Sequence, residues 1–147
     1  LILAGTHESS CAKVSDIFGR FGVAYQIHDD LIDLCAPDKQ RLPGSDLREG
    51  RVSAVILQFW QHASAAEREQ FATFFHSAEQ RACPQRVEQW VQHLGASEAL
   101  EATFVYLKQT LAECRREATT LPDPLNAFMS LVISELEQRI APSRGDA

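Results

Sequence analysis

The sequence predicts an all-α protein, and three observations support this fold class. Helix caps and apolar residues at 3.6-residue spacing recur along the 147 residues, whereas the alternation typical of strands is scarce. Apolar residues make up 45% of the chain and charged residues 23%, which are ordinary proportions for a globular domain. The pattern therefore predicts a helical bundle and excludes collagen-like and disordered classes.

The longest predicted helix runs from Ser10 to Leu34, a stretch without proline that is too long for a strand. Before it, Leu1 to Gly5 looks like the end of an apolar helix that stops at a glycine. The chain is therefore expected to be a fragment of a longer protein. After it, the segment from Ala36 to Gly50 is rich in proline, glycine and charge, which predicts one extended loop.

The later helices are predicted mainly from their capping residues. Serine hydroxyls satisfy the free N–H groups of a first turn, and proline is tolerated there because it has no N–H to leave unpaired. The first of these helices runs from the Ser53 cap to about His62, and the next begins at the capping box Ser64-Ala65-Ala66-Glu67. A third runs from Pro84 through Arg86 to Leu94 and stops at Gly95. The last two run from Ser97 to Thr119 and from Asp123-Pro124 to before Pro142.

Charge and cysteine content limit the classes of function. Fourteen Lys and Arg stand against twenty Asp and Glu, and the net charge of −6 has the wrong sign for binding nucleic acid through its phosphates. No apolar run approaches the roughly 20 residues that cross a bilayer, so no transmembrane segment is expected. The four cysteines form no C-x-x-C pair, and we expect free thiols in a cytoplasmic protein.

One face of the long helix is acidic. At about 100° per residue, Tyr25, Gln26, Asp29, Asp30 and Asp33 fall within an arc of about 140°. Apolar residues occupy the opposite side, which predicts that the helix lies inside the bundle. The three carboxylates are then expected to project into a cavity, where their mutual repulsion needs compensation.

Three kinds of compensation are open: protonation, basic partners or a bound cation. Carboxylate oxygens without a His or Cys at zinc-like spacing suit Mg²⁺, which prefers to share its coordination shell with phosphate oxygens. The following loop supplies positive charge for such a ligand through Lys39, Arg41, Arg48 and Arg51. The alternative is a structural network in which the aspartates pair with these arginines and bind nothing.

Two motifs in this region resemble a known family. The pattern Gly22-x-x-Tyr25-Gln26-x-x-Asp29-Asp30-x-x-Asp33, followed by Gly44-Ser45-Asp46-Leu47-Arg48-Glu49-Gly50-Arg51-Val52-Ser53, resembles the second aspartate-rich region of the trans-isoprenyl diphosphate synthases, the polyprenyl synthetase family. The resemblance implies an isoprenoid-synthase helical bundle, with residues 1–147 as the C-terminal half of the domain. It also implies a prenyltransferase that condenses isopentenyl diphosphate with an allylic diphosphate in the presence of Mg²⁺.

The resemblance also assigns roles to individual residues. Asp29 and Asp30 match metal ligands, and Asp33 matches a ligand or a supporting residue in the same cluster. Gln26 is expected beside the allylic chain, and Tyr25 in the cavity wall. Arg41 and Arg51 stand where the family usually has lysines, which keeps the charge for diphosphate binding but changes its geometry.

The family's first aspartate-rich motif and its isopentenyl diphosphate site belong upstream of Leu1. We therefore expect this chain alone to be inactive as a prenyltransferase, and we expect a homodimer because the family is usually dimeric. Two alternatives remain open: a non-catalytic helical subunit or regulator of a synthase, and a related class I terpene cyclase.

Overall fold

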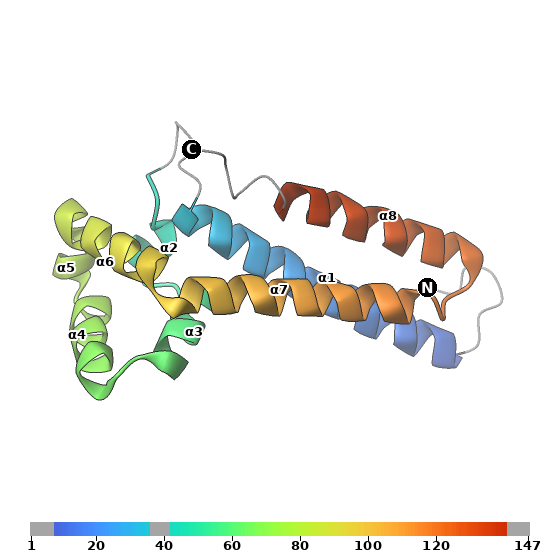
Figure 1. Cartoon of the computed structure of the whole chain (residues 1–147), viewed down its shortest axis with the longest axis horizontal. Helices are drawn as coiled ribbons and strands as arrows, with labels where there is room; N and C mark the ends of the chain where they lie inside the picture. Colours follow the sequence, from blue (N-terminus) through green and yellow to red (C-terminus); the bar gives the residue numbers. More distant parts are fainter. Residues whose placement is uncertain (1–7, 36–41, 141–147) are drawn as a thin grey trace. The chain divides into compact units, whose positions relative to one another are not determined.

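The computed structural model of the chain describes residues 8–35 and 42–140. Within these two ranges the backbone forms eight α-helices and no β-strand, which confirms the all-α prediction (Figure 1). In chain order the helices are α1 (Glu8–Cys35), α2 (Ser45–Glu49), α3 (Ala54–His62), α4 (Ala65–His76), α5 (Ala78–Ala82), α6 (Pro84–Ala96), α7 (Glu98–Ala118) and α8 (Asp123–Ile140).

The predicted helices are confirmed, with small changes at their ends. Helices α3 and α4 begin directly after their expected caps, Ser53 and Ser64. Helix α6 continues one residue past the expected stop at Gly95, to Ala96. The short helices α2 and α5 were not predicted, and α2 lies in the segment expected to be an extended loop. The apolar turns expected at Leu1–Gly5 lie outside the described residues.

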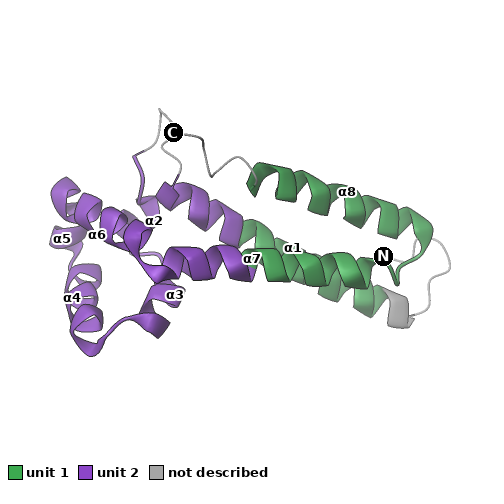
Figure 2. Cartoon of the chain, viewed as in Figure 1, with its two compact units in different colours: residues 1–26, 107–147 green, residues 27–106 purple. Residues whose placement is uncertain are grey.

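The chain folds as two compact units, which Figure 2 distinguishes by colour. Unit 1 comprises residues 1–26 and 107–147, and unit 2 comprises residues 27–106. The boundary falls within α1 and again within α7, so each of these helices contributes residues to both units. The acidic positions Asp29, Asp30 and Asp33 belong to unit 2.

Unit 1 is built from the first part of α1, the last part of α7, and α8. Its buried residues recur on one face of each helix, as expected for helices that pack against one another. They include Ile17, Ala24, Leu107, Leu111, Cys114, Ala118, Met129, Ile133 and Leu136. Ion pairs link Arg20 to Glu117 at 2.6 Å and Arg115 to Glu137 at 2.7 Å, so α7 is tied to both of its neighbours.

Unit 2 has an aromatic core formed by α3, α4 and α6. The rings of Phe59 and Phe71 lie 5.5 Å apart, and Trp90 lies 5.0 Å from Phe71 and 5.8 Å from Phe74. The three phenylalanines are buried. Each such pair adds about 0.5–1.5 kcal/mol beyond the burial of its area. Helix α3 of this core, like the short helix α2, contacts the acidic segment of α1.

Candidate functional site

The acidic segment of α1 places its aspartates in different surroundings. Ile27 and Leu31 are buried, as the predicted apolar face requires. Asp30 is also buried, with 8% of its surface exposed, whereas the side chain of Asp29 is 51% exposed. The expectation that all three carboxylates project into an enclosed cavity is therefore wrong for Asp29, because its side of α1 faces solvent.

The buried carboxylate of Asp30 is bound to the start of helix α3. Its Oδ2 accepts a hydrogen bond from the backbone N–H of Ala54 at 2.7 Å. Ser53 caps the same helix end through a hydrogen bond from the N–H of Ile56. The first N–H groups of a helix have no intrahelical acceptor and carry partial positive charge, so a carboxylate is stabilised there.

Asp33 is bound in the same way to the start of helix α2. Its Oδ1 accepts hydrogen bonds from the backbone N–H of Ser45 at 3.1 Å and from the hydroxyl of Ser45. Its Oδ2 accepts a bond from the N–H of Asp46 at 3.2 Å. The N–H of Gly44 donates to the Asp33 carbonyl at 2.9 Å. Asp33 therefore holds the start of α2 against α1, and its predicted role toward a metal stays a prediction.

Backbone N–H groups at the starts of two helices thus compensate the negative charge of these aspartates, and the sequence did not suggest this kind of compensation. Protonation, basic partners and a cation were the three expected kinds, but Asp30 and Asp33 both bind backbone N–H groups. Their partners Ala54 and Ser45 lie 24 and 12 positions further along the chain. Nothing in the local pattern connects residues at such separations.

Asp46 and Arg51 form an ion pair beside this cluster. The Nε of Arg51 lies 3.2 Å from Asp46, and its Nη2 lies 3.0 Å from Glu49. Burial raises the pKa of the Asp46 carboxyl, and repulsion from Asp33 and Asp30 raises it further. The carboxyl groups of Asp33 and Asp30 therefore lie near enough to Asp46 to disfavour its charged form.

The remaining predicted residues are distributed unevenly. Tyr25 and Gln26 are exposed on α1, one turn before Asp29. Arg48 donates hydrogen bonds to the carbonyls of Pro43, at 2.9 Å, and Leu42. Its side chain therefore stabilises the segment that leads into α2. Arg41 and Lys39 lie outside the described residues.

A metal site at these aspartates stays a prediction. Within the described part of the chain, no three His, Cys, Asp or Glu side chains are grouped closely enough to hold a metal ion by themselves. Mg²⁺ is usually held by one or two carboxylates, with water and phosphate oxygens completing its octahedron. The exposed carboxylate of Asp29, next to the buried Asp30, fits this mode of binding.

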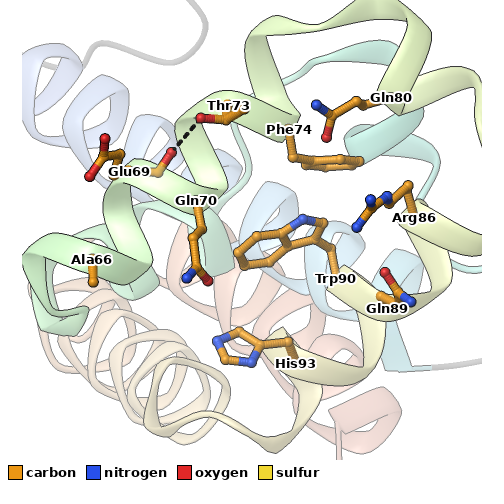
Figure 3. Close-up of a pocket in the computed structure, with 10 residues that line it drawn as sticks. All are labelled: Ala66, Glu69, Gln70, Thr73, Phe74, Gln80, Arg86, Gln89, Trp90 and His93. Carbon is orange, nitrogen blue, oxygen red and sulfur yellow. Dashed lines mark hydrogen bonds between the residues drawn. The ribbon is translucent and has the colours of Figure 1, made fainter.

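A separate pocket lies among α4, α5 and α6. Figure 3 shows the Trp90 ring at its centre, with Gln70, Arg86 and His93 around it. Its volume is about 660 Å³, and its lining is mainly polar. None of the predicted metal- or diphosphate-binding residues that the structure describes lines this pocket.

Comparison with known proteins identifies the family. The polyprenyl synthetase family model matches residues 1–94. Because this match covers more than half of the chain, the protein belongs to the polyprenyl synthetase family, as the two motifs predicted. The match includes both motifs, while the membership of residues 95–147 in the same domain stays a prediction.

One curated relative is a short chain isoprenyl diphosphate synthase from Methanothermobacter thermautotrophicus. It is 26% identical over 103 residues, which cover 69% of this chain and 31% of the relative. The chain thus spans about a third of the length of that relative. No solved structure matches the chain. Among the described helices, none combines the length and apolar character needed to cross a membrane.

Proposed function

We propose that this chain carries the second aspartate-rich, Mg²⁺-dependent diphosphate site of a prenyltransferase. The reaction would join isopentenyl diphosphate to an allylic diphosphate, as the family motifs imply. One observation supports this most strongly: Asp29 is half exposed, while Asp30 and Asp33, which follow it on the same helix, are held by two helix N-termini. The half-exposed carboxylate of Asp29, which lies 3.8 Å from Nδ1 of His28, would then be accessible to a cation.

Asp29 and Asp30 would hold Mg²⁺, and Asp33 would fix the loop beside them. The chemistry that Mg²⁺ supplies when bound is stabilisation of negative charge on the pyrophosphate that leaves the allylic carbon. Arg51 adds positive charge on the same side of α2, and Arg41 would do so from the preceding segment. Gln26 and Tyr25, one turn earlier, would contact the allylic chain.

The bond changes in this reaction are simple to account for. The allylic C–O bond breaks and both of its electrons leave with pyrophosphate. The double bond of isopentenyl diphosphate then forms the new C–C bond, and a proton is lost from the neighbouring carbon. The chain's contribution is to hold the leaving group in place and to balance its charge.

A second candidate function is a helical subunit or regulator that catalyses nothing. The hydrogen bonds of Asp30 and Asp33 favour it, because both residues have a structural role that needs no ligand. In this case Asp29 would be an ordinary surface carboxylate. The two functions differ in whether Asp29 takes part in binding.

Calorimetric titration of the chain with inorganic pyrophosphate, with and without Mg²⁺, distinguishes these functions. We expect binding that requires both Mg²⁺ and Asp29. Asp29→Asn should weaken it about tenfold or more, since a charge-assisted interaction is worth about 1.5–3 kcal/mol. Asp16→Asn, at another exposed position on α1, is the matched control and should bind like wild type. Equal binding by wild type and Asp29→Asn would favour the non-catalytic subunit.

A further inference from the structure

Helix α2 is too short to be stable by itself. It has five residues, and isolated helices shorter than about 12–15 residues are marginal in water. Glycines in the left-handed region flank it, with φ of 83° at Gly44 and 68° at Gly50. The position of α2 must therefore come from its contacts with other elements.

The N-terminal end of α2 is held from two sides. Asp33 of α1 accepts the hydrogen bonds from Ser45 and Asp46 described above. On another side, Gly44 packs so closely against α6 that an added Cβ would lie 2.6 Å from Cγ2 of Val91. Glycine is required here both by its backbone angle and by this contact.

The C-terminal end of α2 is held by Arg81 of helix α5. Nη1 of Arg81 donates a hydrogen bond to the carbonyl of Arg48 at 3.2 Å. This carbonyl belongs to the last turn of α2, where carbonyls have no intrahelical donor. The guanidinium also lies against Gly50, where an added Cβ would collide with Nη1 and Cζ. Arg81 thus binds the end of α2 through one hydrogen bond and through close packing.

The segment between these two ends carries charged groups of the proposed site. Asp46 lies within α2, and Arg51 follows Gly50 directly. The N–H of Arg51 donates to the Asp46 carbonyl at 2.8 Å, and its side chain pairs with the Asp46 carboxylate. A shift of the C-terminal end of α2 would move both charges relative to Asp33 and Asp30.

We infer that Arg81 is a positioning residue for the aspartate-rich site, an inference that rests on the function proposed above. Arg81 contacts neither metal nor diphosphate. It holds the C-terminal end of α2 against α5, while Asp33 holds the N-terminal end against α1. Together they fix where Asp46 and Arg51 lie beside the carboxylates that bind Mg²⁺.

The test compares variants of the full chain for Mg²⁺-dependent binding of inorganic pyrophosphate. Arg81→Ala should weaken binding about tenfold, because it displaces Arg51, whose charge-assisted contact with the pyrophosphate is worth about 1.5–3 kcal/mol. Arg81→Lys keeps a donor but loses the planar fork, so its affinity should fall between those of wild type and Arg81→Ala. Arg115→Ala removes an arginine of similar exposure in unit 1 and should leave the affinity unchanged.

A second measurement separates a local effect on α2 from general destabilisation. Hydrogen exchange at the amides of α2 should accelerate in Arg81→Lys, while the amides of α7 and α8 keep their wild-type protection. If Arg81→Lys and Arg81→Ala both bind pyrophosphate like wild type while Asp29→Asn does not, the role of Arg81 is refuted and the proposed function stands. If Asp29→Asn also binds like wild type, the proposed function is refuted, and the role of Arg81 with it.

Discussion

Helices α4 and α3 differ in where the groups that cap their first turns come from. Helix α4 is capped by its own neighbours: the Ser64 hydroxyl accepts a bond from the N–H of Glu67, and the Glu67 carboxylate accepts one from the N–H of Ser64. Helix α3 has a local cap in Ser53, but its first N–H donates to Asp30, which is 24 positions earlier in the chain. Local caps stabilise one helix, whereas a distant cap also joins two elements.

This difference matters because the distant caps lie on the proposed site. Asp30 and Asp33 have two roles, since they hold α3 and α2 against α1 and also lie close to Asp29 on the same helix. Loss of either residue should therefore affect stability and binding together. Loss of Asp29, which is mostly exposed, should affect binding alone.

The largest expected effect on stability comes from breaking the distant cap at Asp30. Asp30→Ala leaves the N–H of Ala54 without this acceptor in a partly buried position, and we expect the free energy of unfolding to fall by about 2 kcal/mol. Urea denaturation followed by circular dichroism measures this change. Asp29→Ala is the matched control, one residue away on the same helix, and should stay within about 0.5 kcal/mol of wild type.

Equal stability of the two variants would contradict the structural role assigned to Asp30. Its carboxylate would then be held no more firmly than that of Asp29. The distinction between a buried aspartate that caps a helix and a half-exposed one, which supports the proposed function, would be lost with it.

The sequence predicts much of the fold because the relevant signals are local. Ser53 and Ser64 precede apolar helices, and the apolar residues of α1 recur at helical spacing, so these elements are predicted with small errors at their ends. Helix α2 is missed because its five residues hold no periodic signal, and because its position depends on Asp33 and Arg81.

The candidate site is predicted in part for the same reason. The motif identifies Asp29, Asp30 and Asp33 by their spacing on one helix. It does not show that one is exposed and two are caps, because burial depends on which elements pack against α1. The backbone N–H of Ala54 binds Asp30, and the guanidinium of Arg81 binds the end of α2. Neither contact can be predicted from the residues around the motif.

A smaller effect is expected from the local cap of α4. Ser64→Ala removes the acceptor for the N–H of Glu67 and should lower the free energy of unfolding by about 1 kcal/mol, the usual cost of losing a serine N-cap. The same urea denaturation measures it. Because this cap joins no second element, binding of pyrophosphate with Mg²⁺ should be unchanged. A loss of binding in Ser64→Ala would mean that α4 is coupled to the acidic segment.

The smallest expected effect is a dependence of this cap on pH. Hydrogen bonds from the side chain and the backbone of Ser64 lower the pKa of the Glu67 carboxyl below its ordinary value. A carboxyl whose pKa is lower in the folded state stabilises the fold above its unfolded pKa, and this contribution is lost as the pH falls through the folded pKa. Unfolding measured from roughly pH 6 down to pH 3 should therefore show a slightly shallower loss of stability in Ser64→Ala than in wild type. NMR titration of the Glu67 side chain should show its pKa rising toward the ordinary value in the same variant. If the pKa of Glu67 does not move, the capping box is not formed in solution, and α4 would begin without the reciprocal bond that distinguishes it from α3.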